Sequence, residues 1–455
     1  MVTNRRLLLG PPGTGKTRRL LQEMERAIER GVPPQRIAFV SFTRAAVRHA
    51  RSLACERFNL TEEELPYVRT LHSLAFYQLS LTRGKVFGRE ALVRLSELTG
   101  EDLTGKVELD APTLGERGDA LLFLDQYARA SLVTLDDAWQ HHGTPLDWFR
   151  LKRFTDAYAG MRRDENLYDF TDMLEIYVTE GRPVDVDLCL IDEAQDLTPL
   201  QWQVVERAFS NVPELVVDGD DDQGIYHWAG ASADALLSFR GEKEVLAQSY
   251  RLPRTVHALA SQVSSGISRR YDKLFHSTDA EGSVEWLGRP NEVDLSSGTW
   301  LLLARTRRQL SGLEEIARSQ GVTYLLQQRA SVDPSHVADI REYETFRAGD
   351  STLPLWHDAL TSISLDDREY LLSCLRRGES LTRTPRVRID TIHGAKGLEA
   401  DHVMLLTDIN ARIKRGMELD PDGEARVWYV GVTRAKVALY PVIAQRPGGG
   451  FVLDG

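Results

Sequence analysis

The stretch Gly10-Pro11-Pro12-Gly13-Thr14-Gly15-Lys16-Thr17 decides which fold the rest of the chain must adopt. It matches the phosphate-binding pattern G-x-x-x-x-G-K-[ST] at every specified position. The glycines let the backbone turn tightly enough for successive N–H groups to point at one phosphate. Lys16 can then reach the terminal phosphates, and the Thr17 hydroxyl can ligate Mg²⁺. The stretch therefore predicts a site for a nucleoside triphosphate.

The residues on either side of this loop predict a strand and a helix. The apolar residues 7–9 favour a short strand, and residues 17–30 carry apolar side chains at a helical period that Gly31 closes. In that order, the helix N-terminus brings its partial positive charge to the phosphate.

Length and composition bound the class of protein. A chain of 455 residues, 42% of them hydrophobic, predicts about three domains. Cys55, Cys189 and Cys374 fit neither a zinc nor a disulfide spacing, which favours a reducing cytoplasm. No apolar run reaches membrane-spanning length, so we expect no membrane partner. The net charge of −11 argues weakly against a coat of nucleic acid but leaves room for a local basic groove.

Two further apolar stretches carry polar or aromatic residues where they end. Residues 36–42 predict a buried parallel strand that reaches Phe42 and Thr43, and residues 68–72 include Thr70 and His72. Such residues suit a surface that holds a phosphate backbone and stacks bases. Taken singly, however, a residue of this kind at a strand end more often has no binding role.

The segment from residue 81 to residue 163 has a helical pattern without a catalytic cluster. Helices are predicted at residues 90–98, 119–130 and 147–162. His141 and His142 suggest a metal pair, but adjacent residues do not converge on one helix face, and no carboxylate stands at ligand spacing. We therefore expect a helical insertion without a metal site.

Carboxylates follow two later strands. Residues 186–191 predict a strand that ends at Asp192 and Glu193, where an Asp can hold Mg²⁺ and a Glu can polarise the attacking water. Another strand runs into residues 219–228, GDDDQGIYHW. Its three adjacent acids would repel one another without a cation or donors nearby, and calcium is a rival interpretation that lacks the ligand pattern of an EF-hand. Gln223 can sense the terminal phosphate, and Trp228 can stack a base or simply belong to the core.

A second α/β unit follows Tyr250 and Arg251. Buried strands are predicted at residues 300–304, 387–392 and 402–407. Residues 329–384 between them are mixed and mostly helical, and residues 427–436 present Arg434 on an apolar helix.

The chain carries an ordered series of motifs that resembles the motif set of the UvrD/Rep/PcrA-type superfamily 1A DNA helicases. The series is GPPGTGKT, VSFTRAA, RTLHSLAF, DFTDML, LIDEAQD, GDDDQGIYHWAGA, QSYR, TIHGAKGLE and WYVGVTRAK. It spans almost the whole chain, and GDDDQGIYHWAGA and VGVTRAK are long, specific signatures. The resemblance implies two RecA-like domains that clamp ATP between them while single-stranded DNA crosses both and the protein moves 3′ to 5′.

The resemblance also implies a role for individual residues. The residues implied to hold ATP are Gly10, Pro11, Pro12, Gly13, Thr14, Gly15, Lys16 and Thr17 at the phosphates, Arg18 and Tyr250 around adenine, and Glu399 at the ribose. Thr17 and Asp192 are implied to hold Mg²⁺. The residues implied to act in catalysis are Lys16, Glu193 as the base, Gln223 at the γ-phosphate, and Arg251 and Arg434 as arginine fingers. The implied contacts to DNA are Phe42, Thr43, Thr70, His72, Trp228, Thr391 and His393.

The implied fold class is α/β, with two RecA-like P-loop domains, a helical insertion in the first and a short insertion in the second. The expected segments are 1–80 and 166–243 for the first domain, 81–165 for its 1B-like insertion, 244–328 and 385–455 for the second domain, and 329–384 for a reduced 2B-like insertion. The family normally reads adenine with a Gln ahead of the loop. Only nine residues precede Gly10 here, and Asn4 is their sole amide.

The sequence therefore predicts an ATP- and Mg²⁺-dependent DNA helicase or translocase of 3′-to-5′ polarity that unwinds duplex. We expect a cytoplasmic monomer whose partners are single-stranded DNA and duplex junctions. One alternative is a translocase that remodels nucleoprotein without unwinding. The other is a non-motor nucleotide switch, against which the intact Lys16, Asp192, Glu193, Arg251 and Arg434 argue.

Overall fold

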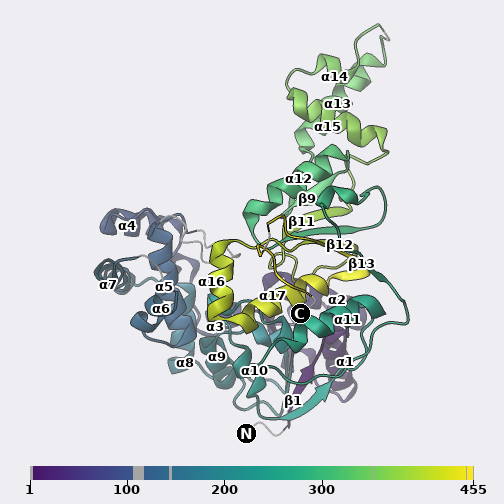
Figure 1. The fold of residues 1–455 in the computed structure, drawn as a ribbon. Helices are drawn as coiled ribbons and strands as arrows, with labels where there is room; N and C mark the ends of the chain where they lie inside the picture. Colours follow the sequence, from purple (N-terminus) through teal and green to yellow (C-terminus); the bar gives the residue numbers. More distant parts are fainter. Residues whose placement is uncertain (1–3, 106–116, 143–145, 351, 447, 454–455) are drawn as a thin grey trace. The chain divides into compact units, whose positions relative to one another are not determined.

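The computed structural model describes residues 4–105, 117–142, 146–350, 352–446 and 448–453. Its contacts group the chain into two units (Figure 1). Unit 1 comprises Met1–Tyr250 and Arg269–His276, and unit 2 comprises Arg251–Ser268 and Ser277–Gly455. Among the described residues, no helix combines the length and apolar character that crossing a membrane requires.

Unit 1 is built on a parallel six-stranded sheet with the order β3-β2-β4-β5-β1-β6. Its strands are β1 (Asn4–Leu9), β2 (Ile37–Ser41), β3 (Val68–Arg69), β4 (Leu188–Asp192), β5 (Glu214–Gly219) and β6 (Glu242–Val245). Because all are parallel, the carboxyl ends of β1, β4 and β5 lie at one edge of the sheet. The phosphate loop and the two acidic segments begin at that edge.

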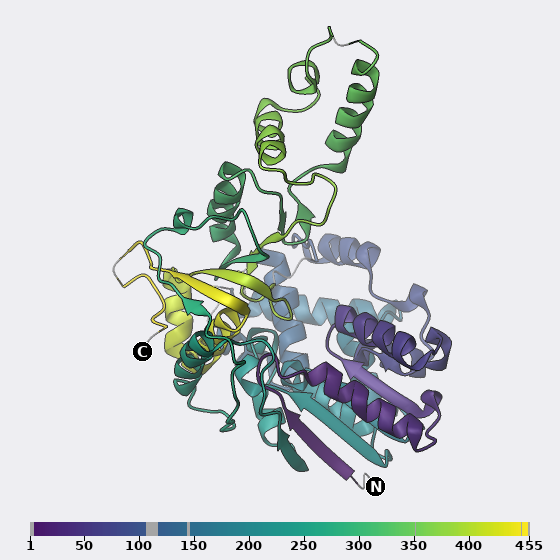
Figure 2. The same ribbon diagram turned by 90° about the vertical axis from the view of Figure 1, so that its right-hand side faces the viewer.

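Helices cover both faces of this sheet. They are α1 (Lys16–Glu29), α2 (Arg44–Phe58), α3 (Leu71–Gln78), α8 (Phe170–Glu180), α9 (Pro199–Ala208) and α10 (Ala233–Leu237). Successive strand residues point to opposite faces, so Leu8 packs with α1 and α2, whereas Leu7 and Leu9 pack with α3, α8 and α9. Figure 2 shows helices on both faces of the sheet. Burial on both faces explains why β2 and β4 are apolar throughout apart from their last residues.

The helical insertion of unit 1 has a core of its own. It contains α4 (Arg89–Thr99), α5 (Arg117–Ser131), α6 (Leu135–His142) and α7 (Trp148–Asp164). Leu95, Leu124, Leu151 and Phe154 are among its buried residues. The three predicted helices are confirmed, whereas α6 was not predicted. No group of three His, Cys, Asp or Glu side chains suited to a metal occurs among the described residues.

Unit 2 contains a seven-stranded sheet with the order β10-β9-β11-β8-β12-β13-β7. Its strands are β7 (Ser283–Val284), β8 (Trp300–Ala304), β9 (Tyr324–Leu326), β10 (Arg329–Ala330), β11 (Val387–Thr391), β12 (Ala400–Leu406) and β13 (Ala435–Val442). All pairs are parallel except β10 with β9. The fold is therefore α/β with two parallel-stranded sheets flanked by helices, as the sequence predicts.

The short insertion of unit 2 is part of the core that its sheet forms. The helices of unit 2 are α11 (Arg254–Ser265), α12 (Leu310–Ser319), α13 (Pro334–Arg347), α14 (Trp356–Ala359), α15 (Leu365–Arg376), α16 (Ala411–Leu419) and α17 (Pro421–Val432). Trp356, Leu371 and Cys374 share one buried cluster with Leu302 and Tyr324 of the sheet. Parts of the segment 329–384 thus pack against the sheet of unit 2, whereas α13 has no buried residue, and the first residues of the segment form β10.

Several local expectations differ from the structure. Arg434 does not lie on a helix, because α17 ends at Val432 with Thr433 as its C-cap, and β13 starts at Ala435. The apolar stretch 68–72 is only partly a strand, since β3 ends at Arg69 and Thr70 caps α3. The contacts also place residues 244–250 and 269–276 with unit 1, where β6 pairs with β1.

Candidate active site

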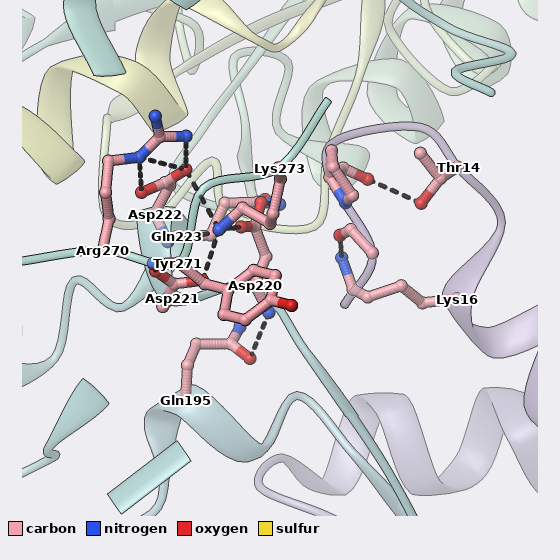
Figure 3. A network of polar contacts seen from close by, with 12 residues as sticks. Thr14, Lys16, Gln195, Asp220, Asp221, Asp222, Gln223, Arg270, Tyr271 and Lys273 are labelled. Carbon is pink, nitrogen blue, oxygen red and sulfur yellow. Dashed lines mark hydrogen bonds and ion pairs between the residues drawn. The ribbon is translucent and has the colours of Figure 1, made fainter. Parts of the chain in front are cut away.

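The phosphate loop is a closed turn between β1 and α1. Gly13 and Gly15 have φ angles of 74° and 80°, in the left-handed region that glycine adopts without strain. The Thr14 hydroxyl donates to the Pro11 carbonyl at 2.8 Å, and Lys16 Nζ donates to the Gly10 carbonyl at 3.0 Å (Figure 3). Lys16 therefore lies folded over the loop, where a phosphate would displace it from a carbonyl oxygen.

Gly10 leaves no space for a side chain, because a Cβ there would lie 2.2 Å from Lys16 Cγ. We expect Gly10→Ala to displace Lys16 and lower nucleotide affinity by about tenfold or more, since a hydrogen bond to a charged group contributes about 1.5–3 kcal/mol. Binding of a fluorescent ATP analogue measures this. Gly160→Ala in α7 is the matched control, as nothing lies within 4 Å of its Cβ. Unchanged affinity in Gly10→Ala would contradict this arrangement of the loop.

Asp192 and Glu193 stand at the end of β4, beside the phosphate loop. Glu193 has a φ of 54°, a conformation that costs about 1–3 kcal/mol for a residue with a side chain. Its N–H donates to Asp218 Oδ1 at 3.1 Å, which holds this backbone in place. Glu193 Oε1 lies 3.8 Å from Lys16 Nζ, and the Gln195 amide donates to Glu193 Oε2. The Lys16 ammonium and the Glu193 carboxylate, the two groups that would face a terminal phosphate, are thus close together.

Asp192 has the chemistry of a cation ligand. Its Oδ1 is buried and accepts no hydrogen bond within the described residues. Burial, together with the charge of Glu193, raises the pKa of Asp192 to about 7. A buried carboxylate oxygen in this state is stabilised by a metal ion, and a hard oxygen ligand suits Mg²⁺. The residues present therefore fit a magnesium ion.

The three acids Asp220, Asp221 and Asp222 are fully buried after β5. Lys273 Nζ, itself fully buried, lies 2.9 Å from Asp220 Oδ1 and 3.1 Å from Asp222 Oδ2 and contacts Asp221 (Figure 3). Arg270 donates to both carboxylate oxygens of Asp222, at 2.9 and 2.6 Å. The cation that the acidic run requires is thus supplied by the protein, about fifty residues later in the chain.

A chain of hydrogen bonds joins these acids to the Glu193 segment. Gln223 donates to Asp220 Oδ2 at 2.7 Å, and the Asp220 N–H donates to Gln195 Oε1 at 3.1 Å. Gln195 in turn donates to Glu193. The short helical turns at Ala194–Asp196 and Asp221–Gln223 bring these side chains together. Gln223, Asp220, Gln195 and Glu193 therefore form one connected network.

The two buried lysines keep their charge. Burial lowers the pKa of Lys16, but the carboxylates around it, Glu193 first, outweigh burial and raise it overall. The pKa of Lys273 is raised in the same way, by Asp220 above all against the effect of burial. Burial tends to raise the pKa of Asp220, yet the two lysines lower it overall, so this carboxyl is ionised at neutral pH.

Tyr250 and Arg18 are exposed beside the phosphate loop. The Tyr250 side chain is 72% exposed, while its N–H donates to the Gly13 carbonyl at 2.8 Å. Ser249 Oγ donates to the Pro12 carbonyl at 2.8 Å. Arg18 occupies the first turn of α1 and is exposed. An exposed ring fixed by its own backbone at the loop suits stacking on a flat base.

Unit 2 brings Arg251, Glu399 and Arg434 together. Arg251 Nε donates to Glu399 Oε2 at 2.7 Å, and Arg251 Nη1 is 3.5 Å from the Thr433 carbonyl. Arg434 is 1% exposed and donates to the Val430 carbonyl at 2.9 Å and to Thr433 Oγ1 at 3.0 Å. Glu399, predicted to hold a ribose, pairs here with the arginine.

The predicted DNA contacts of unit 1 include stacked rings. Phe42 stacks on Tyr226 with ring centroids 5.6 Å apart, and Trp228 stacks on Phe123 at 6.2 Å. Trp228 is 8% exposed, so it also has the burial of a core residue. Tyr226 and Phe123 were not predicted. Tyr226 stands two residues before Trp228 in the same motif, and this proximity is the signal by which the sequence could have identified it. Phe123 lies in the insertion, where the sequence offers no motif.

The remaining predicted DNA contacts are polar. The Thr43 and Thr70 hydroxyls accept from the N–H groups of Ala46 and Ser73 and so begin α2 and α3. Burial, helped by the charge of Arg44, lowers the pKa of His72 to about 4, so His72 is neutral at pH 7.

In unit 2, Thr391 and His393 are buried at the end of β11, and Thr391 Oγ1 accepts from the Gly394 N–H at 3.1 Å.

Comparisons with known proteins identify relatives of this chain. The ATP-dependent DNA helicase UvrD2 of Mycobacterium tuberculosis is 26% identical over 97% of this chain and 77% of its own length. The ATP-dependent DNA helicase PcrA of Staphylococcus epidermidis is 23% identical over 70% of this chain and 48% of its own length. The protein YjcD of Bacillus subtilis is 25% identical over 63% of this chain. The match covers 40% of YjcD, so the chain spans less than half of two of these relatives.

Two domain families account for most of the chain. Residues 361–446 match the UvrD-like helicase C-terminal domain. Residues 1–244, more than half of the sequence, match the UvrD/REP helicase N-terminal domain. The protein therefore belongs to the UvrD/REP helicase family.

Proposed function

We propose that this chain is an ATP-driven DNA motor that moves 3′ to 5′ along single-stranded DNA and unwinds duplex. The observation that carries the proposal is the connected network of Glu193, Gln195, Asp220 and Gln223 beside Lys16. Binding a nucleotide requires a phosphate loop. A motor needs a base for water and a sensor of the γ-phosphate in addition, and this network joins both.

In this proposal, the hydrolysis site is assembled from unit 1. Lys16 binds the terminal phosphates, and Thr17 and Asp192 are the residues that would hold Mg²⁺. The ion would neutralise phosphate charge when bound. Glu193 orients the attacking water and accepts its proton, and Gln223 contacts the γ-phosphate. The strained backbone of Glu193, held by Asp218, fixes the direction of its carboxylate.

Arg251 and Arg434 of unit 2 supply positive charge to the phosphoryl group as it transfers. Arg434 is held by carbonyl oxygens and Arg251 by a carboxylate, so both guanidinium groups are fixed before nucleotide binds. Tyr250 and Arg18 enclose the base.

The DNA strand is held by rings and hydroxyls. Phe42 and Trp228 stack bases, while Thr43, Thr70 and the neutral His72 bind the backbone or base edges through hydrogen bonds. Thr391 and His393 contribute from unit 2. Gln223 and Trp228 belong to one short loop, so contact with the phosphate and grip on the base are linked through five residues of chain.

Trp228→Ala should weaken single-strand binding by about fivefold to 150-fold, because stacking a base on an aromatic ring contributes about 1–3 kcal/mol. Fluorescence anisotropy with a labelled oligonucleotide measures the affinity. Basal ATP hydrolysis without DNA should persist. Trp202→Ala is the matched control, because Trp202 is 9% exposed and its indole N–H likewise has no partner in the described residues. Equal loss of DNA affinity in both variants would assign Trp228 to the core.

ATP hydrolysis with and without a single-stranded oligonucleotide tests the proposed function. We expect hydrolysis that requires Mg²⁺ and is stimulated by single-stranded DNA, and less by RNA. Absence of hydrolysis in the presence of DNA would contradict the proposed motor and favour the alternative of a non-motor nucleotide switch. Stimulated hydrolysis without strand separation would leave a translocase that remodels nucleoprotein.

A further inference from the structure

Residues Arg269–His276 form what we call the return segment. They belong to unit 1, although the residues before Arg269 and after His276 belong to unit 2. The chain thus leaves unit 2 after Ser268, contributes eight residues to unit 1, and then re-enters unit 2 at Ser277. A change in the backbone conformation of the flanking unit 2 residues is therefore transmitted to the return segment through the covalent chain.

The return segment is anchored on the acidic loop Asp220–Gln223. Lys273 reaches three carboxylates, with Nζ 2.9 Å from Asp220 Oδ1 and 3.1 Å from Asp222 Oδ2 and in contact with Asp221 (Figure 3). The Tyr271 N–H donates to Asp221 Oδ2 at 2.7 Å. Charged hydrogen bonds between fully buried groups are strong and directional, so Lys273 is held firmly.

The other end of the return segment is bonded to the segment that holds the phosphate loop. The His276 N–H donates to the Ala247 carbonyl at 2.7 Å, and the Ser249 N–H donates to the His276 carbonyl at 2.9 Å. Ser249 Oγ donates to the carbonyl of Pro12 in the phosphate loop. The return segment is therefore linked to both loops that the proposed function assigns to the nucleotide.

Asp220 is the point where Lys273 meets the proposed γ-phosphate sensor. One oxygen of this carboxylate, Oδ1, takes Lys273, and the other, Oδ2, accepts the Gln223 amide at 2.7 Å. The Asp220 N–H is bonded to Gln195. Since both carboxylate oxygens are engaged, the direction in which Gln223 points depends on where Lys273 holds Asp220.

We propose that Lys273 is a positioning residue for ATP hydrolysis, which holds Asp220 so that Gln223 faces the γ-phosphate and ties that orientation to the chain of unit 2. The proposal rests on the proposed function of Gln223. In this proposal, the return segment is the covalent connection between the nucleotide site and unit 2. A change in the bound nucleotide can therefore change the backbone conformation of the unit 2 residues on either side of the segment, and the reverse also holds. Arg270, on the same segment, neutralises Asp222 and therefore serves as the control for charge in the acidic loop.

The test measures kcat and KM for DNA-stimulated ATP hydrolysis, together with the melting temperature. The variants are Lys273→Met, Asp220→Asn and the charge-balanced double variant. Lys273→Met and Asp220→Asn should each lower kcat by about tenfold to a hundredfold, the scale of a misplaced contact at a reacting group. KM for ATP should change by less than about threefold, because Lys16 and the phosphate loop are untouched. The matched control Arg270→Gln should keep kcat within about threefold.

The double variant separates positioning from charge balance. If Lys273 acts through Asp220, the double variant should have the kcat of Asp220→Asn alone, since the second change removes nothing further. Multiplied losses, or a kcat that returns to the wild-type value together with the melting temperature, would overturn the proposal. So would wild-type kcat in Lys273→Met.

Two further outcomes are also decisive. If Lys273→Met fails to fold because three buried carboxylates lose their cation, the comparison of Asp220→Asn with the double variant decides alone. If wild-type protein shows no DNA-stimulated hydrolysis, the proposed function is wrong, and the positioning role that rests on it is overturned with it. A loss of kcat that is absent only from Lys273→Met overturns the positioning role alone.

Discussion

Replacing Glu193 with glutamine will abolish ATP turnover while nucleotide and single-strand binding persist. The amide has the shape of the carboxylate but cannot accept the proton of the attacking water. General base catalysis contributes about a hundredfold to ten-thousandfold, and we expect kcat to fall by at least that much. Lys16, which lies 3.8 Å from Glu193, keeps its contact with the phosphate, so ATP binding is preserved. Steady-state hydrolysis with equilibrium binding of ATP and DNA measures both parts.

The matched control for this variant is Glu206→Gln. Glu206 belongs to the same unit and is 55% exposed, and it pairs with Arg5 at the surface. Its replacement removes one carboxylate without touching the site, so kcat should not change. Wild-type turnover in Glu193→Gln would remove Glu193 from the mechanism, whereas loss of ATP binding would assign it to nucleotide affinity.

Arg251→Ala should lower kcat by about a thousandfold or more, the scale of a lost arginine finger. Its guanidinium is held by Glu399 within unit 2, so the group is ordered before ATP binds. Arg251→Lys should restore little of the activity, because an ammonium cannot reproduce the planar fork of a guanidinium. Single-turnover hydrolysis in the presence of DNA measures the chemical step directly.

Arg254→Ala is the control for this second variant. Arg254 starts α11 three residues later, is 58% exposed and pairs with Glu281. Its removal takes the same charge from the same unit and should leave kcat within about twofold, as expected for an exposed ion pair. A comparable loss in both variants would show that net charge, rather than a placed guanidinium, matters.

The parallel sheets could be predicted because their strands carry the pattern themselves. Residues 188–191 are apolar on both faces and are followed by the carboxylate of Asp192, and this is what a buried parallel strand before a phosphate site requires. The phosphate loop was predictable for the same reason, because its glycines meet local requirements. Gly13 and Gly15 adopt positive φ angles, and Gly10 leaves space for the Lys16 side chain. The short edge strand Glu242–Val245 was not, because three of its four residues are charged and none is buried, and its pairing with β1 is a long-range contact.

The partner of the acidic run could not be predicted from the sequence. Three adjacent Asp residues required a cation, but nothing local distinguishes Lys273 from the other basic residues of the chain. Its choice depends on the return of a short segment to unit 1, which is a property of the whole fold. The position of Arg434 was missed for a related reason. The apolar run of α17 continues into β13, and only tertiary packing sets the boundary at Thr433.

Strand separation on duplexes with a single-stranded tail tests the central claim most directly. Two substrates with the same duplex are compared, one with a 3′ tail and one with a 5′ tail, with ATP and Mg²⁺ and with Glu193→Gln as the inactive control. We expect wild-type protein to separate the 3′-tailed duplex and to leave the 5′-tailed duplex intact, and we expect Glu193→Gln to separate neither. Preference for the 5′ tail, or equal separation by wild type and Glu193→Gln, would contradict the central claim.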